Sequence, residues 1–387
     1  MSHAPSAALS RRHASLRATL ARAGVDALVV TALPNVLYLT NFTGSSGIVV
    51  IDAERLQFIT DFRYVSALAG SRGAAYECPA LELVVVDGSY DATLAATIAP
   101  LAGRRVGFEA VHLSVARHQW LTSTIASAAA NRSGGAAAAA ELVPTEGIVE
   151  RLRVRKDDYE IATIREAARR LSGVAREVVA GVRRGRTERE TATDIERLMR
   201  GAGFDKPAFD TIVASGPNAA LPHAHPTERT ITEGDLVVLD FGGVYDSYCV
   251  DLTRTVAVGR AVPRMRTVYD AVRAAHDNAI AAVAPGRSRF DIDAAARDTL
   301  TAAGLGDAFG HGTGHGLGIE VHEEPRVSRR RPDVDASDES VAPGMIFTIE
   351  PGAYLPGWGG VRIEDDVLVT ETGVEVLTDV GTALVEV

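Results

Sequence analysis

Residues 235–259 read DLVVLDFGGVYDSYCVDLTRTVAVG, two apolar runs joined by a polar centre. Runs rich in valine, leucine and threonine around such a centre predict a long antiparallel hairpin. One carboxylate interrupts each run, Asp240 in the first and Asp251 in the second. With the turn centred between Tyr245 and Asp246, the two aspartates would lie directly opposite, with Cβ atoms about 5 Å apart. Such a pair requires a proton or a cation between its members.

Residues 344–370, GMIFTIEPGAYLPGWGGVRIEDDVLVT, repeat this arrangement. Glu350 ends one apolar strand and Glu364 lies within the next, and Gly357 marks their midpoint in a PGWGG turn. The two glutamates are therefore predicted to face each other. A single acid in a strand is usually a surface residue at a sheet edge, but two hairpins that each pair acids within apolar strands favour a buried site.

A third stretch, FGHGTGHGLGIEVHEEP at 309–325, is rich in histidine and glycine. His311 and His315 have the spacing of helical metal ligands, but the intervening glycines would each cost about 1 kcal/mol in a helix. The pattern instead predicts a tight turn and then a strand from Gly314. A straight strand puts His315 and His322 on opposite faces, so a bend is needed to unite them. Alone, the stretch is equally consistent with a loop of solvated histidines.

Together these segments predict a metal centre. Four carboxylates and one neutral imidazole carry a formal charge of −4, which two divalent cations balance. Oxygen-rich ligands with one imidazole suit manganese, cobalt, zinc or iron. Two such ions about 3.5 to 4 Å apart form a hydrolytic site. In this interpretation His315 supplies the imidazole, and the glycines let its strand pass close to the metals.

Length and composition exclude several classes of protein. With 387 residues, the chain is long enough for two or three domains. Its net charge of −10 disfavours nucleic acid and anionic membranes as partners. Two cysteines make no disulfide framework, and no stretch resembles a signal peptide or a membrane span. These features predict a cytoplasmic globular protein.

The order of predicted elements indicates an α/β domain followed by a second domain. Strands and helices alternate in the first part of the chain, beginning with a helix at 9–23 and a buried strand at 25–31. The alanine-rich segment 126–144 marks a boundary near residue 145. Beyond it we expect long helices, one with a capping box from Thr187 to Glu190, then strands and a helix pair near 264–303.

The chain resembles the pita-bread metallopeptidases, which include aminopeptidase P and prolidase and act at Xaa-Pro bonds. The resemblance covers nearly the whole chain, and five motifs occur in the family's order. They are ASGPNAALPHAHPT (214–227), LDFGGVYDSYCVDLTRT (239–255), GHGTGHGLGIEVHEEP (310–325), FTIEPGAYLPG (347–357) and GVRIEDDVLV (360–369). The segment PNVLYLTNFTGSSG (34–47) resembles the creatinase-like domain of bacterial members.

The resemblance implies a site for two divalent ions, with Mn²⁺ favoured over Co²⁺ or Zn²⁺, and a role for each matching residue. Asp251 and Glu364 would bridge the ions, and a hydroxide shared by the ions would attack the scissile carbonyl. Glu350 would carry the proton to the leaving nitrogen, with His223 or His322 assisting the carbonyl oxygen. The implied metal ligands are Asp240, Asp251, His315, Glu350 and Glu364, and the implied substrate-binding or supporting residues are His223, His311, His322, Tyr354 and Arg362. His225 is expected to be incidental.

It also implies a creatinase-like α/β domain at 1–145 and a pita-bread catalytic domain at 146–387, with a curved antiparallel sheet and flanking helices. Substrates would be small peptides with proline second, and the chain would form a homodimer, in which Asn41 and Phe42 could approach the partner's site. Dipeptidase and aminopeptidase P activity remain open. The alternatives are a metal-free creatinase-like hydrolase and a non-catalytic peptide-binding scaffold. A methionine aminopeptidase would share the catalytic domain but lacks so long an N-terminal domain.

Overall fold

The computed structural model describes residues 3–133, 138–330 and 339–387. The chain divides into two compact units, Met1–Arg153 and Val154–Val387. The division therefore lies beyond residue 145, because helix α6 (Ile148–Val154) is bound to helix α2 (Leu33–Thr40) of the first unit. Asn35 Nδ2 donates to Glu150 Oε1 at 2.6 Å, and Arg153 Nη1 donates to Asn35 Oδ1 at 2.7 Å.

The alanine-rich segment 126–144 lies inside the first unit. Its beginning is the end of helix α5 (Val115–Ser133), and its end falls in strand β6 (Glu141–Thr145). Residues 134–137 lie outside the described part of the chain. Low sequence complexity therefore marks a connection within a domain here, and the domain ends one strand and one helix later.

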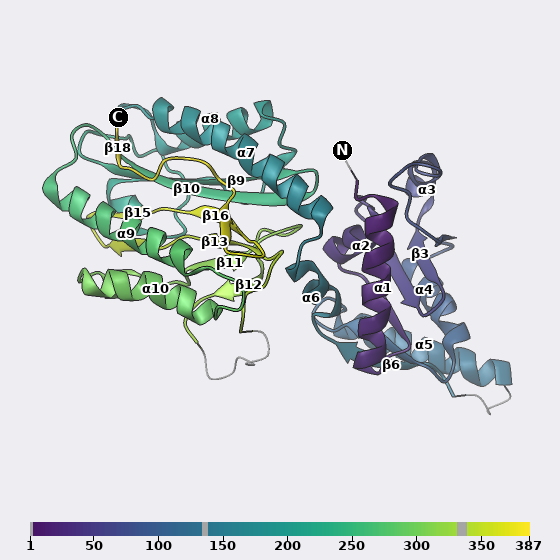
Figure 1. The fold of residues 1–387 in the computed structure, drawn as a ribbon. Helices are drawn as coiled ribbons and strands as arrows, with labels where there is room; N and C mark the ends of the chain where they lie inside the picture. The colour runs from purple at the N-terminus through teal and green to yellow at the C-terminus, as the bar shows by residue number, and fades with distance from the viewer. Residues whose placement is uncertain (1–2, 134–137, 331–338) are drawn as a thin grey trace. The chain divides into compact units, whose positions relative to one another are not determined.

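A six-stranded mixed sheet organises the first unit, in the order β4-β3-β2-β1-β5-β6 (Figure 1). All four residues of β1 (Ala27–Val30) are buried. Ala27 and Val29 pack in one core cluster with residues of α4 (Tyr90–Ile98) and α5, and the residues between them face the other side of the sheet. The remaining elements are α1 (Ser6–Ala23), β2 (Ile48–Asp52), β3 (Leu56–Thr60), α3 (Phe62–Gly70), β4 (Leu81–Val85) and β5 (Arg105–Glu109).

Two helix pairs flank the strands of the second unit (Figure 1). Helices α7 (Asp158–Gly181) and α8 (Glu188–Gly201) both begin with a capping box, and the predicted one from Thr187 to Glu190 is confirmed. The other pair is α9 (Pro263–Ala282) and α10 (Arg289–Ala302), near the predicted 264–303. The predicted class, α/β with helices flanking largely antiparallel sheets, is confirmed.

The strands between these helices form three sheets. One contains β18 (Val385–Glu386), β10 (Tyr248–Ala257), β9 (Leu236–Tyr245) and β7 (Lys206–Pro207), with β8 (Ile212–Ser215) also paired to β9. A second has the order β12 (Glu323–Val327), β11 (Gly314–Gly316), β13 (Ile346–Ile349), β16 (Asp365–Val369) and β17 (Val374–Val376), and the third pairs β14 (Gly352–Leu355) with β15 (Gly359–Arg362). A bridge from Thr253 to Glu364 joins the first sheet to the C-terminal hairpin.

The predicted register of the first hairpin is wrong by one position at its turn. Strands β9 and β10 join through Asp246 and Ser247, which both have positive φ, 47° and 73°. Asp240 therefore pairs with Thr253, and Asp251 pairs with Gly242. A two-residue turn with both central residues in the left-handed region matches the twist of the strands better than the assumed centre. Asp251 still shares a face with Thr253, so the aspartates are diagonal neighbours.

The predicted register of the C-terminal hairpin is confirmed. Leu355 pairs with Gly359 across a turn that contains Gly357, and Ile349 pairs with Asp365 further along the same register. Glu350 and Glu364 occupy matching positions between these two ladders. The four-residue strands β13 and β14 are separated there because the chain passes from one sheet to the next.

Candidate metal centre and active site

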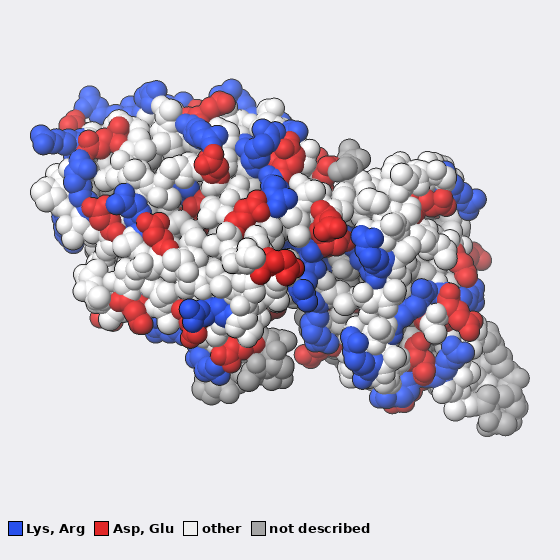
Figure 2. Space-filling view, in the orientation of Figure 1, with Lys and Arg blue, Asp and Glu red and all other residues white. Residues whose placement is uncertain are grey.

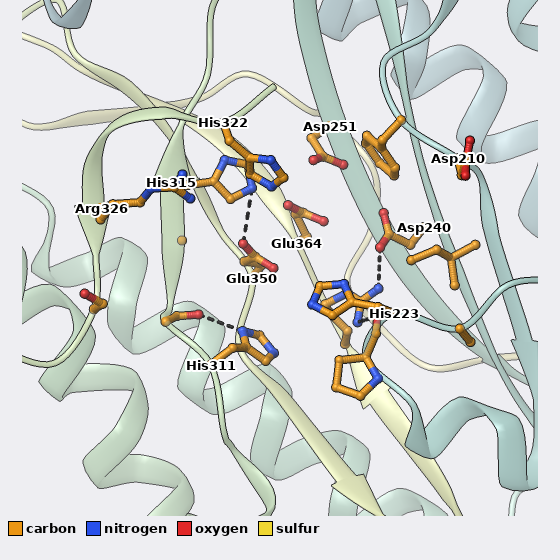
Figure 3. A pocket seen from close by; sticks show the side chains of 18 of the residues that line it. Asp210, His223, Asp240, Asp251, His311, His315, His322, Arg326, Glu350 and Glu364 are labelled. Atoms are coloured by element: carbon orange, nitrogen blue, oxygen red, sulfur yellow. Dashed lines mark hydrogen bonds and ion pairs between the residues drawn. The ribbon is translucent and has the colours of Figure 1, made fainter. Parts of the chain in front are cut away.

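A cavity of about 680 Å³ in the second unit brings most of the predicted site residues together. Its walls come from β8, β9, β10, β11 and β12, the ends of β13 and β15, and neighbouring segments. Figure 3 shows the carboxylates and imidazoles directed toward one another across it. The predicted residues that line it are His223, Asp240, Asp251, His311, His315, His322, Glu350, Arg362 and Glu364.

Three of the predicted ligands form the tightest cluster. One ligand atom from each of Asp251, His315 and Glu364 lies within 4.8 Å of the others, and all three residues are buried. Asp251 comes from β10, His315 from β11, and Glu364 from the position between β15 and β16. These three donors from separate segments converge where the bridge from Thr253 to Glu364 joins two sheets.

Glu350 and Asp240 lie at the edge of this cluster. Glu350 follows β13, and its Oε1 is 3.4 Å from His315 Nε2. Asp240, in β9, accepts a hydrogen bond from Arg362 Nη2 through Oδ2. One of its two carboxylate oxygens is therefore already paired with a guanidinium group. Thr348 Oγ1 also donates to Glu350 Oε1, at 3.3 Å.

Burial and mutual repulsion raise the pKa of the clustered carboxyl groups. The pKa of Glu350 is raised to about 7, chiefly by burial. Burial, followed by the neighbouring carboxylates, raises the pKa values of Asp251 and Glu364 well above their ordinary range. Asp251 Oδ1 is buried and accepts no hydrogen bond from any residue that the structure describes. A divalent cation would supply the missing positive charge and a partner for this oxygen, so these donors fit such an ion.

The tautomer of His315 also suits a ligand. Its Nδ1 is 3.1 Å from the carbonyl oxygen of Gly316, which accepts a hydrogen bond and leaves the Nε2 lone pair free. Burial lowers the pKa of His315 to about 3, so the ring is neutral at pH 7. Neutral imidazole is the form that binds metal ions.

The glycines around His315 serve close packing of strands. A Cβ atom at Gly314 would lie 1.8 Å from the carbonyl oxygen of Thr348, and one at Gly316 would lie 2.1 Å from that of Glu324. Real Cβ atoms never come so close, so both positions require glycine. The crowding comes from neighbouring backbone, so strand packing alone accounts for both glycines, and the close approach of this strand to the metals stays a prediction.

The predicted strand from Gly314 to Val321 is wrong beyond Gly316. Strand β11 ends there, after a register shift at His315, and β12 begins at Glu323. The residues between them form an irregular bend that is held to β10, where the Cys249 amide donates to the Gly318 carbonyl at 2.7 Å. This bend brings the His322 ring to 4.3 Å from the His315 ring, centroid to centroid.

His311 and Tyr354 form a chain of hydrogen bonds behind the cluster. His311 Nδ1 donates to the Gly312 carbonyl, so Nε2 accepts from Tyr354 OH at 2.9 Å. The same hydroxyl accepts from Arg362 Nη1 at 2.7 Å, and Arg362 donates in turn to Asp240. Burial lowers the pKa of His311 to about 4 and raises that of Tyr354 to about 12, so both are neutral at pH 7. This chain of hydrogen bonds therefore holds the Arg362 side chain in place, and Arg362 in turn orients Asp240.

His223 reaches the cavity from an exposed segment after the short helix η2 (Gly216–Ala220). Figure 3 shows its ring on the side of Asp240, across from His322. His225, expected to be incidental, also lines the cavity. The carbonyl oxygen of Pro222 accepts from Arg362 Nη1 at 3.3 Å. Asn41, at the C-cap of α2, donates from Nδ2 to the carbonyl oxygens of Ala4 and Tyr76 within the first unit.

Sequence reasoning missed two threonines and two arginines of the site. Thr253 Oγ1 donates to Glu364 Oε2 at 2.6 Å, and Thr348 Oγ1 accepts from the His315 amide at 3.2 Å. Both threonines are two residues from a predicted ligand, so strand alternation alone could have found them. Arg289 and Arg326 line the cavity, and the sequence offers no comparable signal for them.

Comparison with known proteins gives two family matches. Residues 162–371 match the profile of metallopeptidase family M24, and residues 12–155 match the creatinase/prolidase N-terminal domain. The chain is 39% identical to an uncharacterized peptidase of Bacillus subtilis, over 94% of this chain and 96% of that protein.

Two solved structures are also similar over nearly the whole chain. An Xaa-Pro dipeptidase from Bacillus anthracis superposes with a TM-score of 0.88 at 36% identity, covering 98% of this chain and all of that one. An X-Pro aminopeptidase from Thermotoga maritima superposes with a TM-score of 0.82 at 32% identity, covering 96% of this chain and all of that one. The first of these proteins is named a dipeptidase and the second an aminopeptidase.

Proposed function

The chain belongs to metallopeptidase family M24, and from this premise we propose that it hydrolyses Xaa-Pro peptide bonds with two divalent metal ions. The observation that carries the proposal is the buried cluster of Asp251, His315 and Glu364, within 4.8 Å of one another and flanked by Glu350. A cluster so rich in buried carboxylates is stable as a charged site only with cations.

In the proposed site Asp240, Asp251, His315, Glu350 and Glu364 hold the ions. Such ions polarise a carbonyl group and lower the pKa of a bound water molecule. Manganese is the preferred candidate, because oxygen ligands dominate the set, and cobalt and zinc are the alternatives.

The side chains around the cluster would manage protons and orientation. Glu350 lies 3.4 Å from His315 at the edge of the cluster, where its carboxylate could accept a proton from the nucleophile and return it to the leaving nitrogen. His223 and His322 lie on opposite sides of the cluster in Figure 3, where each could donate to the oxygen that becomes negative. Tyr354 and His311 would keep Arg362 on Asp240.

We propose dipeptidase activity in preference to aminopeptidase P activity. Arg289 and Arg326 line the cavity together with Ser328, and guanidinium groups are suited to bind carboxylates. In an Xaa-Pro dipeptide the free carboxylate is on the proline itself, next to the bond that is cut. In a longer peptide an uncharged amide occupies that position.

A panel of metals and peptides tests the proposal. Protein freed of metal is reconstituted with Mn²⁺, Co²⁺ or Zn²⁺, bound metal is counted by elemental analysis, and hydrolysis of Xaa-Pro, Xaa-Pro-Xaa and Xaa-Ala peptides is followed. About two ions per chain and turnover of Xaa-Pro alone support the proposal. Preference for the tripeptide would assign aminopeptidase P activity. Absence of both metal and turnover would refute metallopeptidase function.

The state of the protein in the cell is part of the same proposal. We propose a homodimer in the cytoplasm, where the two buried and unpaired thiols, Cys78 and Cys249, stay reduced. No helix among the residues described is long and apolar enough to cross a membrane. Acidic and basic side chains are interspersed over the face in Figure 2, which fits small peptides as substrates in place of a polyanion. Light scattering of the purified protein measures the assembly.

A further inference from the structure

The segment that carries His223 is fixed at both of its ends by one buried carboxylate. Strand β8 ends at Ser215, helix η2 follows, and His223 lies in the irregular chain that returns at Thr227. Glu188, the first residue of α8, is fully buried. We call residues 215–227 the histidine loop.

Glu188 accepts hydrogen bonds from both ends of the histidine loop. Its Oε1 accepts from the Ser215 amide and hydroxyl, both at 2.7 Å. Its Oε2 accepts from the Thr227 amide at 3.0 Å and from the Thr227 hydroxyl at 2.6 Å. Asn218 Nδ2, inside the loop, is 3.0 Å from Oε1 and 3.1 Å from Oε2. The carboxylate is thus the common acceptor for the first, middle and last parts of the loop.

Other contacts each hold one part of the loop. Arg229 Nη1 donates to the Ser215 hydroxyl at 2.5 Å, and the Thr227 carbonyl oxygen accepts from the Arg189 amide at 3.1 Å. Helix η2 packs against β15, where a Cβ at Gly360 would lie 2.0 Å from the carbonyl oxygen of Ala219. Arg362 donates to the Pro222 carbonyl at 3.3 Å. His223 is exposed, and no residue that the structure describes forms a hydrogen bond with its ring. The position of His223 over the cavity therefore depends on how the ends of the loop are anchored.

A carboxylate suits this anchor better than a neutral side chain. Its partners from the loop all act as donors toward it, and Glu188 lies at a helix N-terminus, where a negative charge is favoured. Burial alone would raise the pKa of Glu188, but the hydroxyl and amide groups of Thr227 and Ser215 lower it below its ordinary value. Glu188 is therefore ionised at pH 7 and can use both oxygens as acceptors.

We propose that Glu188 is a positioning residue for the reaction, which holds His223 over the cavity by clamping both ends of the histidine loop. The inference rests on the proposed peptidase function, because it assigns Glu188 a role through a residue that touches the substrate. A carboxylate that merely stabilised α8 would affect folding without affecting His223 in particular.

Glu188→Gln tests the clamp, and Glu190→Gln is the matched control. Glutamine keeps the shape of the side chain but replaces one acceptor oxygen with a donor, which faces the donors of one loop end. Glu190 is two residues further along α8, where it accepts from the Thr187 amide in the capping box and forms no hydrogen bond with residues 215–227. Glutamine also serves in a capping box, so this control should keep activity, metal content and melting temperature.

The expected results are kinetic and structural. In the Mn²⁺-reconstituted enzyme, Glu188→Gln should lower kcat/KM for an Xaa-Pro dipeptide about ten- to hundredfold, since a displacement of about 1 Å can cost that much, while bound metal stays unchanged. In a His223→Ala background the same change should cost less than about twofold, because the residue it positions is gone. Hydrogen exchange should rise in peptides from 215–227 and stay unchanged in peptides from α7.

Other outcomes overturn the inference. An equal loss of kcat/KM with and without His223 would show that Glu188 stabilises the protein structure in general. Unchanged kinetics would show that the clamp is dispensable. If Glu188→Gln does not fold, Glu188→Asp, which keeps both oxygens on a shorter side chain, takes its place. If the wild-type enzyme cleaves no Xaa-Pro peptide, the proposed function has failed, and exchange in the loop alone then decides whether Glu188 is its clamp.

Discussion

The dipeptide His-Gly occurs twice in the histidine-rich stretch, and the two imidazoles have different surroundings. In both, Nδ1 donates to the carbonyl oxygen of the following glycine, so Nε2 is the free nitrogen. The Nε2 atom of His315 faces Glu350, whereas that of His311 accepts from Tyr354. The contact with the next residue therefore sets the tautomer of each ring, but the partner of Nε2 is set by distant strands.

One substitution at Glu350 distinguishes its role as a metal ligand from its role as a proton carrier. Glu350→Gln keeps the size of the side chain but removes its charge and its capacity to accept a proton. We expect kcat on an Xaa-Pro dipeptide to fall at least about a hundredfold, the usual contribution of general acid–base catalysis, with a smaller loss of bound metal. Steady-state kinetics and elemental analysis on the same sample measure both. Wild-type turnover would contradict the role of Glu350.

Arg326 tests which end of the peptide the cavity recognises. Arg326→Met keeps much of the aliphatic volume and removes the guanidinium group. If that group binds the proline carboxylate, kcat/KM for Xaa-Pro should fall about tenfold or more, as expected for a lost charge-assisted hydrogen bond, and hydrolysis of Xaa-Pro-amide should not change. Arg330→Met is the control, since Arg330 pairs with Glu339 and does not line the cavity. Equal losses on both substrates would contradict carboxylate recognition.

At the scale of elements, the sequence predicted where the strands lie better than how they bend. The PGWGG turn fixed the register of the C-terminal hairpin, because glycine and proline mark a turn unambiguously. The first hairpin turns at Asp246 and Ser247, neither of which is glycine, although both adopt positive φ. The sequence indicated that a bend must bring His322 back to His315, but the course of that bend could not be predicted, because it depends on backbone contacts to β10 that no local pattern reports.

Strand β11 offers a test of the close packing that places His315. Gly314→Ala would put a Cβ atom 1.8 Å from the Thr348 carbonyl oxygen, so β11 and β13 must separate. We expect a loss of about 3 kcal/mol or more in unfolding free energy, together with weaker metal binding, since β11 carries His315. Gly310→Ala is the matched control, because its Cβ would meet nothing within 4 Å. Thermal denaturation that ranks the two variants equally would contradict this account.

At the scale of the molecule, the predicted ligands all belong to the second unit, Val154–Val387. Ligand binding at the cavity can therefore stabilise this unit directly, by mass action on its folded state. The first unit has its own core around β1 and its own buried network at Asn35. Its unfolding is expected to be a separate event with its own midpoint.

Metal removal should therefore destabilise one unit in a way that depends on pH. Without cations, burial raises the pKa of Glu350 from 4.5 to about 7, so the folded unit binds this proton more tightly than the unfolded chain does. The contribution of this proton to the stability of the metal-free unit is fully present below about pH 4.5, where Glu350 is protonated in both states. It is lost as the pH rises through about 7, and the loss is about 3 kcal/mol for this group alone. Calorimetry of metal-free and Mn²⁺-loaded protein should show a larger gap between their midpoints at pH 7 than at pH 5, confined to the transition of the second unit. A gap that is equal at both pH values would show that buried carboxylate charge is not what the metal compensates.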